Sequence, residues 1–444
     1  MKASRYNHFF EIEGTDFVLG YNAFSGALAE IEKVNHPRVV QLLANPSQAQ
    51  TKEDREFIEC LTAGGFLITE GIDQTAIFKH RAKTYRLKGN ILTLTIAPTL
   101  ACNFSCDYCF ESRSTTRMSP QTQDALIRYA DQYLVKAEAL RICWFGGEPT
   151  TCFSLVESLQ TRLLELADRH RIDVMPGMII SNGYLLDVAM AENLKRLRID
   201  RAQITIDGPE AVHDRRRKLL NGRGSFGRII ENLERTSGIL EINVRINVDR
   251  TNIDSAFEVV EILKRRDILS KVKIHFAQVT SSGSTCADIR ENCIGDEEFS
   301  NTLIQIYDRL FKMGIRQIEY PYIFSGGAFC GALAEGYLVV SPDGHLFKCW
   351  EELSTDAANS VGNLFSAAPS EQQKANLDAY LSWDPFTFSE CHECNILPIC
   401  MGGCPVAARK ENLRSRGACT PWKYILKELT QLRYFDEIQK ASKQ

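Results

Sequence analysis

The chain has 444 residues, of which 24% are charged and 44% are hydrophobic, and its formal net charge is -4 at pH 7. This balance provides neither the basic field that attracts nucleic acid nor a polybasic patch for anionic lipid. No stretch is long and apolar enough to span a bilayer, and the first residues lack the apolar core of a signal peptide. We therefore expect a cytoplasmic protein that binds no nucleic acid and no membrane. A chain of this length exceeds one hydrophobic core, which predicts two or three domains.

Residues 1–85 are predicted to form a small module of their own. The segment 8–22, HFFEIEGTDFVLGYN, is typical of two short strands around a Gly-Thr-Asp turn, and a further strand is expected at 66–69. Helices are expected at 25–34, 37–45 and 52–65. A strand pair with three helices is winged-helix-like. Because these helices are acidic or mixed in charge, we favour a peptide-recognition module over a DNA-binding one.

Residues 90–315 alternate short apolar runs with amphipathic helices. Strands are expected at 91–98, 140–147, 177–183, 202–208, 242–249 and 271–278, with helices at 119–139, 154–170 and 255–267. This alternation predicts an α/β fold with a parallel sheet, and six units suit a partial (β/α)6 TIM-like barrel. In such barrels the chemistry takes place on the loops that follow the strands.

Residues 320–444 are rich in turns and cysteine. The segment 336–350, GYLVVSPDGHLFKCW, predicts a hairpin whose turn is Pro-Asp-Gly. The segment 391–405, CHECNILPICMGGCP, is expected to be a loop held by ligands, and 421–441 is expected to be a helix. We predict a separate cysteine-rich domain here.

The fifteen cysteines are not expected to form disulfides, because cytosolic thiol pools keep such bridges reduced. Binding of a metal or cluster is the leading alternative, and ten of the cysteines fall into two groups, at 102–109 and 330–419. The remaining cysteines are expected to be small buried hydrophobic residues: Cys60, Cys143, Cys152, Cys286 and Cys293.

The first group, Cys102, Cys106 and Cys109, has the spacing C-x3-C-x2-C and follows the first predicted barrel strand. Thiolates are soft ligands that suit an iron-sulfur cluster or zinc. Three protein ligands on a four-iron cluster leave one iron open to a small molecule. The alternative is a structural zinc site that takes its fourth ligand from elsewhere in the chain.

This spacing, with an aromatic residue at Tyr108, resembles the signature of radical S-adenosylmethionine (SAM) enzymes, in the branch with a C-terminal SPASM domain. The resemblance implies that SAM chelates the open iron and that one electron from the cluster cleaves it to a 5'-deoxyadenosyl radical. It assigns no catalytic side chain, because the chemistry belongs to the cluster. The resemblance also implies SAM contacts at the ends of later strands: Gly146, Gly147, Glu148, Pro149, Ser181, Asn182, Thr205 and Asp207.

The GGEP segment resembles the part of the family that binds the SAM amino group. Glycines permit a close backbone approach, and Glu148 can accept charge-assisted hydrogen bonds from an ammonium. Ser181-Asn182 and Thr205 to Asp207 are equally typical of helix-capping turns when judged alone. Arg217 and Arg245 are candidates to pair with the SAM carboxylate.

The second group resembles the seven-cysteine pattern of SPASM domains, which hold two auxiliary 4Fe-4S clusters. By that resemblance the outer cluster is held by Cys391, Cys394, Cys400 and Cys419, and the inner cluster by Cys330, Cys349 and Cys404. The inner set lacks a fourth cysteine, because Phe324 stands where sulfatase-maturing relatives have one. Its site is therefore open or is completed by another kind of ligand. A zinc ribbon at 391–404 is the alternative.

The expected cofactors are SAM and three 4Fe-4S clusters, but the barrel does not select a reaction. In sulfatase maturases an aspartate follows the second SPASM cysteine, whereas here Cys349 is followed by Trp350 and Glu351. The first hypothesis is therefore a peptide maturase that takes hydrogen from a residue of a ribosomally made precursor peptide and forms a thioether or carbon-carbon crosslink. Its expected partners are the leader of that peptide, bound at a sheet edge of residues 1–85, and a reductant such as flavodoxin or ferredoxin.

Three alternatives remain open at this point. The enzymatic one is an anaerobic sulfatase-maturing enzyme that generates formylglycine. The others are a non-catalytic iron-sulfur electron carrier and a zinc-stabilised peptide-binding module.

Overall fold

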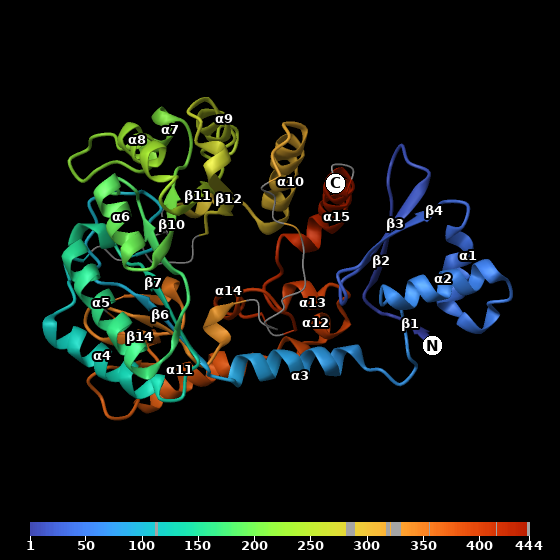
Figure 1. The fold of residues 1–444 in the computed structure, drawn as a ribbon, viewed down its shortest axis with the longest axis horizontal. Helices are drawn as coiled ribbons and strands as arrows, with labels where there is room; N and C mark the ends of the chain where they lie inside the picture. The colour runs from blue at the N-terminus through green and yellow to red at the C-terminus, as the bar shows by residue number, and fades with distance from the viewer. Residues whose placement is uncertain are drawn as a thin grey trace. The chain divides into compact units, whose positions relative to one another are not determined.

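The computed structural model describes residues 1–111, 114–280, 289–316, 320, 330–354, 356–413 and 415–441 (Figure 1). The chain divides into two compact units. Unit 1 comprises Met1–Leu87, Asp296–Cys330 and Trp383–Gln444, and unit 2 comprises Lys88–Gly295 and Gly331–Ser382. The three domains predicted at 1–85, 90–315 and 320–444 stay a prediction.

Unit 2 is an α/β structure with a parallel-sheet core. The strands predicted from the sequence are confirmed as β6 (Ile91–Ile96), β7 (Ala139–Trp144), β9 (Gly177–Ser181), β10 (Ile199–Thr205), β11 (Glu241–Val248) and β12 (Val272–Gln278). Neighbours pair in parallel in the order β12-β11-β10-β9-β7-β6. The short strand β8 (Asp173–Val174) pairs with the start of β7.

Helices follow these strands because their apolar residues recur at helical spacing. The predicted helices are confirmed as α4 (Pro120–Leu134), α5 (Phe153–His170) and α9 (Glu258–Arg265). At the start of α4, the Ser119 side chain accepts the Thr122 amide and Pro120 occupies the first turn. The other helices of unit 2 are α6 (Val188–Arg196), α7 (Glu210–Arg216), α8 (Phe226–Thr236) and α11 (Glu371–Leu381).

The predicted hairpin is confirmed as β13 (Tyr337–Val340) and β14 (His345–Phe347). β13 also pairs in parallel with β6, and β15 (Gly362–Asn363) pairs with β14, so the hairpin extends the sheet of unit 2. The reason is burial: Val339 and Phe347 are 0% exposed and share a core cluster with Ala97 and Phe145.

The N-terminal part of unit 1 contains a three-stranded antiparallel sheet of β2 (Asn7–Glu11), β3 (Phe17–Asn22) and β4 (Leu28–Glu32). The helix expected at 25–34 is therefore wrong, because pairing with β3 buries Ile31 and leaves Glu30 and Glu32 exposed. The other predicted elements are confirmed as α1 (His36–Ala44), α2 (Lys52–Ala63) and β5 (Leu67–Ile68), with β5 paired to β1 (Lys2–Ala3). The winged-helix comparison stays a prediction.

The rest of unit 1 is helical. Its helices are α3 (Gln74–Leu87), α10 (Asp296–Lys312), α12 (Ser389–Glu393), α13 (Leu397–Cys400), α14 (Pro405–Lys410) and α15 (Trp422–Ala441), the last confirming the helix expected at 421–441. Phe78 and Ala82 of α3 share a core cluster with Cys391, Leu397 and Cys400. No helix in the described part of the chain is long and apolar enough to cross a membrane.

Candidate functional site

Cys102, Cys106 and Cys109 lie half-buried on the loop that follows β6, and none of them is in a disulfide. The loop is tied by backbone hydrogen bonds to the segment after α7: the Ser105 amide donates to the Lys218 carbonyl (2.8 Å) and the Leu220 amide donates to the Asn103 carbonyl (3.0 Å). The position of the three thiols is therefore set by two loops of unit 2.

Two thiols of this loop, those of Cys102 and Cys109, have pKa values raised by burial. Burial, followed by the nearby Glu148, raises the pKa of Cys102 to about 12. Burial, followed by Glu111, raises the pKa of Cys109 to about 12. A bound cationic cluster is what would stabilise the thiolates here, because metal binding displaces protons from cysteine.

Gly146 and Gly147 pack against the start of the cysteine loop. Gly146 has a φ of 101°, in the region that favours glycine. A Cβ at Gly147 would lie 2.4 Å from the Ala101 carbonyl oxygen. The amides of Gly147 and Glu148 donate to the carbonyls of Thr99 (3.0 Å) and Ala101 (2.9 Å). The close approach that the glycines permit is therefore between two protein loops.

Glu148 joins two other predicted residues, Ser181 and Asn182, in one buried cluster. Its side chain is 0% exposed, and Oε1 accepts hydrogen bonds from the Ser181 hydroxyl (2.9 Å) and the Thr150 hydroxyl (2.6 Å). Oε2 accepts the Asn182 amide (2.7 Å). With two lone pairs, Oε2 keeps the capacity to accept a further donor such as an ammonium. Pro149 begins the 3-10 turn that follows.

Asn182 connects this cluster to the cysteine loop. Its side-chain amide donates to Asn103 Oδ1 (2.7 Å) and lies 4.0 Å from the Sγ atom of Cys102. Thr205, the last residue of β10, is 7% exposed and is paired in register with Arg245 of β11.

Glu111 is a residue that the sequence reasoning missed. It is 8% exposed, and its Oε2 atom is buried with no hydrogen-bond partner. Burial, followed by Glu148, raises its pKa to about 8. The only signal in the sequence was its place two residues after Cys109, and an acidic residue there is ordinarily a solvent-exposed one.

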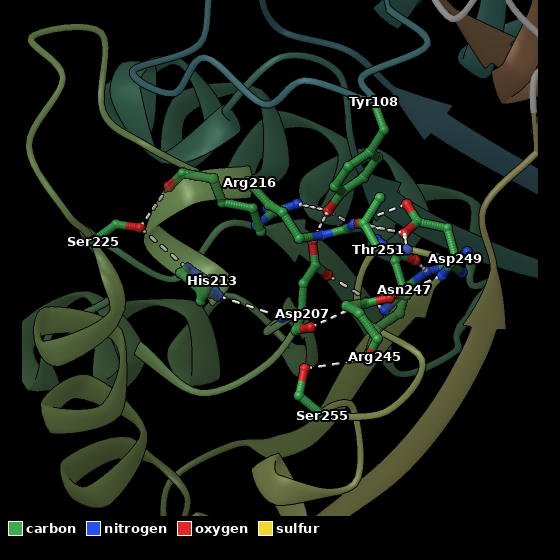
Figure 2. Close-up of polar contacts among 12 residues, drawn as sticks. Tyr108, Asp207, His213, Arg216, Ser225, Arg245, Asn247, Asp249, Thr251 and Ser255 are labelled. Atoms are coloured by element: carbon green, nitrogen blue, oxygen red, sulfur yellow. Dashed lines mark hydrogen bonds and ion pairs between the residues drawn. The ribbon is translucent and has the colours of Figure 1, made fainter. Parts of the chain in front are cut away.

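Tyr108 and Asp207 meet in a buried polar network (Figure 2). The Tyr108 hydroxyl donates to Asp207 Oδ2 (2.5 Å) and accepts from Arg217 Nη1 (2.5 Å) and Asn247 Nδ2 (3.1 Å). Arg216 Nε also lies 3.4 Å from Asp207 Oδ2. Asp207 is 0% exposed, so the end of β10 holds the aromatic residue of the cysteine loop through one buried carboxylate.

Arg216 links Asp207 to the end of β11. Its Nη1 atom donates to both carboxylate oxygens of Asp249 (2.9 and 2.8 Å) and to the Thr251 hydroxyl (2.5 Å). Its guanidinium also lies over the Tyr108 ring, 4.9 Å from the centroid. Arg216 and Asp249 were not predicted, because charged residues on a short helix and after a strand are ordinarily exposed.

The two arginines predicted to meet the SAM carboxylate are placed differently. Arg217 is 8% exposed, and while its Nη1 atom donates to Tyr108, its Nε atom is buried with no partner. Arg245 is half-buried and donates from Nε to Asn247 Oδ1 (2.8 Å). Burial lowers the pKa of Arg245.

His213 holds the turn that carries Arg216 and Arg217. It is 0% exposed, its Nδ1 atom accepts the Asp207 amide (3.3 Å), and its Nε2 atom lies 3.1 Å from the Ser225 hydroxyl. That hydroxyl donates to the Arg217 carbonyl (2.7 Å), so it accepts from Nε2. This pattern requires a neutral imidazole with its proton on Nε2.

Acid is expected to destabilise the protein through His213. Burial, followed by the charge of Arg217, lowers its pKa to about 3, against about 6.5 in an unfolded chain. Between these pH values the unfolded state binds one more proton than the folded state. The contribution of neutral His213 to the free energy of unfolding is therefore complete above pH 6.5. It is lost as the pH falls toward 3, by about 1.4 kcal/mol per pH unit. Urea unfolding of wild type and His213→Asn from pH 7 to 4 measures it. The variant should show the smaller slope, and equal slopes would contradict the assignment.

The four cysteines predicted for the outer cluster line one pocket of unit 1. The pocket has about 380 Å³ of empty space, including space open to solvent. Its walls include Cys391, Cys394, Cys400, Cys419, Ile396, Leu397, Arg416, Thr420 and Lys423. The Thr420 hydroxyl is buried with no hydrogen-bond partner. In the described residues, no three His, Cys, Asp or Glu side chains are arranged to hold a single metal ion.

The cysteines predicted for the inner cluster are divided between the units. Cys330 and Cys404 belong to unit 1 and Cys349 belongs to unit 2, so this set stays a prediction. Phe324 lies outside the described residues. Of the remaining cysteines, Cys143 and Cys152 are buried as expected, Cys293 is half-buried, Cys60 is exposed, contrary to expectation, and Cys286 lies outside the described residues.

The residues of unit 2 fit a 4Fe-4S cluster with an organic ligand on it. Three half-buried thiols on one loop provide the soft donors. Polar atoms of Glu111, Arg216 and Arg217 are buried without partners, which is costly unless a bound group satisfies them. The four-thiol pocket of unit 1, with the unpartnered Thr420 hydroxyl, fits a second cluster in the same way.

Residues 96–263 match the family model of the radical SAM superfamily. The serine-type anaerobic sulfatase-maturating enzyme of Klebsiella aerogenes is 23% identical over 335 residues, which are 71% of this chain and 79% of that protein. The PqqA peptide cyclase of Granulibacter bethesdensis is 23% identical over 319 residues, which are 68% of this chain and 79% of that protein.

Two solved structures share the fold. The structure of anSMEcpe with bound AdoMet and Cp18Cys peptide gives a TM-score of 0.58 at 18% identity, covering 80% of this chain and 99% of that chain. SuiB of Streptococcus suis, bound to the precursor peptide SuiA, gives a TM-score of 0.51 at 16% identity, covering 95% of this chain and 99% of that chain.

Proposed function

Because the chain carries a radical SAM domain at residues 96–263, we propose that it is an enzyme that modifies a ribosomally made precursor peptide. It takes a hydrogen atom from one residue of that peptide and forms a thioether or carbon-carbon crosslink. The observation that carries the radical chemistry is the loop of Cys102, Cys106 and Cys109, held beside buried polar atoms that have no partner. Peptide chemistry is favoured by the similarity to PqqA peptide cyclase and to SuiB with its bound precursor peptide.

Each group of residues has a role in this proposal. Cys102, Cys106 and Cys109 hold the first 4Fe-4S cluster, which with SAM supplies a 5'-deoxyadenosyl radical. Glu148 Oε2, which accepts the Asn182 amide, would hold the SAM ammonium, and the unpartnered Nε atom of Arg217 would hold its carboxylate. Tyr108 is held in place by hydrogen bonds between its hydroxyl and Asp207, Arg217 and Asn247. The protein thus positions the reactants and excludes water, while the cofactors carry the chemistry.

The proposal includes two further clusters and a grip on the leader peptide. Cys391, Cys394, Cys400 and Cys419 hold the outer auxiliary cluster in their shared pocket. By the resemblance to SPASM domains, Cys330, Cys349 and Cys404 hold the inner one. The leader adds a strand to an edge of the β2-β3-β4 sheet, in which β2 and β4 are the outer strands. The reductant is a small redox protein such as flavodoxin or ferredoxin.

A sulfatase-maturing activity is the second candidate, favoured by the similarity to the Klebsiella enzyme. The residue after Cys349 argues against it. That residue is Trp350, so an indole stands at the position after the second SPASM cysteine, where sulfatase maturases have their catalytic aspartate. The Trp350 ring lies 5.9 Å from the ring of Phe145. Glu352, the second carboxylate after Cys349, accepts a hydrogen bond from the Tyr380 hydroxyl (2.5 Å).

The test uses protein reconstituted anaerobically with iron and sulfide, then given SAM and dithionite. Formation of 5'-deoxyadenosine separates a radical SAM enzyme from an electron carrier or a zinc-stabilised module. With a peptide encoded beside this gene, we expect the loss of two hydrogen atoms and a crosslink located by fragmentation. An aldehyde that reacts with a hydrazide, formed on a sulfatase peptide instead, would establish formylglycine synthesis and contradict crosslinking.

A further inference from the structure

One side of the outer-cysteine pocket is lined by cations. Lys423 Nζ and Arg416 Nη1 each lie 3.4 Å from the Sγ atom of Cys419, within hydrogen-bonding reach of sulfur. Lys423 is on the first turn of α15, and Arg416 precedes it on the loop that carries Cys419. Two positive side chains therefore point at one thiol of the four.

The other cysteines of the pocket have fewer donors. The Gly417 amide donates to the Sγ atom of Cys391 (3.3 Å). The Thr420 hydroxyl, buried and without a partner, lines the same pocket next to Cys419 in the chain. One acidic side chain, Glu390, also lines the pocket, and its carboxylate lies 4.0 Å from Arg416 Nε. Two cations therefore face one carboxylate, and both cations lie within hydrogen-bonding reach of the Cys419 sulfur.

We propose that Arg416 and Lys423 raise the reduction potential of the outer auxiliary cluster by donating hydrogen bonds to its Cys419 ligand. This inference rests on the proposed function for the identity of the cluster. Reduction adds one electron and no atom, so the reduced cluster with its thiolates is more negative than the oxidised one. Donors and positive charges at the ligand sulfur stabilise the reduced state more, which raises the potential.

The two side chains should contribute unequally. Arg416 is half-buried and also faces Glu390, whereas Lys423 is exposed. Salt screens exposed charges over roughly 10 Å at 0.1 M ionic strength, so the Lys423 contribution should shrink as salt is added. The hydrogen bond from Arg416 should persist.

The experiment is a redox titration of the full-length reconstituted protein, followed by electron paramagnetic resonance. Cys102, Cys106 and Cys109 are replaced by alanine so that only the auxiliary clusters respond. The outer signal is defined as the one missing after Cys391, Cys394 and Cys400 are all replaced by alanine. At the midpoint potential of the unmodified pocket, we expect Arg416→Gln with Lys423→Gln to lower the reduced-to-oxidised ratio about tenfold, which is about 59 mV for one electron.

Three further variants give matched readouts. Lys423→Arg should keep most of the ratio, because it keeps the charge and a donor. Glu390→Gln should raise the ratio, because it removes the opposing charge. Lys427→Gln, also exposed on α15 and outside the pocket, should leave it unchanged.

Two results would overturn the inference in different ways. An unchanged ratio in the double variant, with iron and sulfide content intact, would refute the role of the cations and leave the proposed function standing. If replacing Cys391, Cys394 and Cys400 together by alanine removed no iron, no outer cluster would exist, and the cluster assignment within the proposed function would fall as well.

Discussion

Gly147→Ala is expected to reduce the rate of SAM cleavage roughly a hundredfold. The added Cβ would lie 2.4 Å from the Ala101 carbonyl oxygen and 2.6 Å from the Leu100 carbonyl carbon. Both atoms are backbone, so no side chain can move aside, and the residues immediately before Cys102 must shift. A displacement of about 1 Å at a reacting group can reduce a rate roughly a hundredfold. Overpacking of this kind also destabilises a fold by about 1–3 kcal/mol.

The measurements for this variant are 5'-deoxyadenosine formation, iron content and thermal unfolding. Gly227→Ala is the matched control, because Gly227 lies in α8 and an added Cβ meets nothing within 4 Å. Its activity should equal that of the wild type, and its stability should rise slightly, since alanine is the better helix former. Full activity in Gly147→Ala would show that the two loops do not need this contact.

Asp207→Asn is expected to destabilise unit 2 by about 3 kcal/mol and to reduce SAM cleavage strongly. The carboxylate is 0% exposed, and its Oδ2 atom faces two donors, the Tyr108 hydroxyl and Arg216 Nε. An amide nitrogen in place of Oδ2 is itself a donor, so it cannot accept the hydrogen bonds of these two donors. The expected loss of stability is at the lower end of the range for a broken buried ion pair, because Arg216 keeps its ion pair with Asp249.

Urea unfolding and 5'-deoxyadenosine formation measure the effect. The control is Asp124→Asn, whose ion pair with Arg162 is exposed and is expected to contribute no more than about 1 kcal/mol. A double-mutant cycle with Tyr108→Phe should show a coupling between the two positions, because they share one hydrogen bond. A loss below about 1 kcal/mol in Asp207→Asn would mean that the network does not hold the cysteine loop.

The elements with strong local signals were predicted well. The six predicted strands of the parallel sheet and the helices α4 and α5 have runs of apolar residues with clear periods, and these periods reflect burial of each element. The helix predicted at 25–34 was wrong. Alanine and glutamate favour a helix locally, but pairing with β3 makes this segment a strand. The pairing of β13 with β6 also had no local signal, because the two strands are far apart in the sequence.

The candidate site shows the same division. Cysteine spacing is a local property, so both cysteine groups were found from the sequence, as were Glu148, Ser181 and Asn182 at the ends of strands. Glu111, Arg216 and Asp249 were missed, because in sequence they are ordinary charged residues. Only burial makes an unpartnered carboxyl or a shared guanidinium informative, and burial depends on neighbours distant in the chain.

By itself, the sequence determined the α/β organisation and the thiols available to hold clusters, because periodicity and spacing are written along the chain. The tertiary structure alone decided what surrounds those thiols. It brought Asp207 to Tyr108 and the Glu148 carboxylate to Asn182 on the loop after β9. These contacts join residues through folded loops, so no local pattern encodes them.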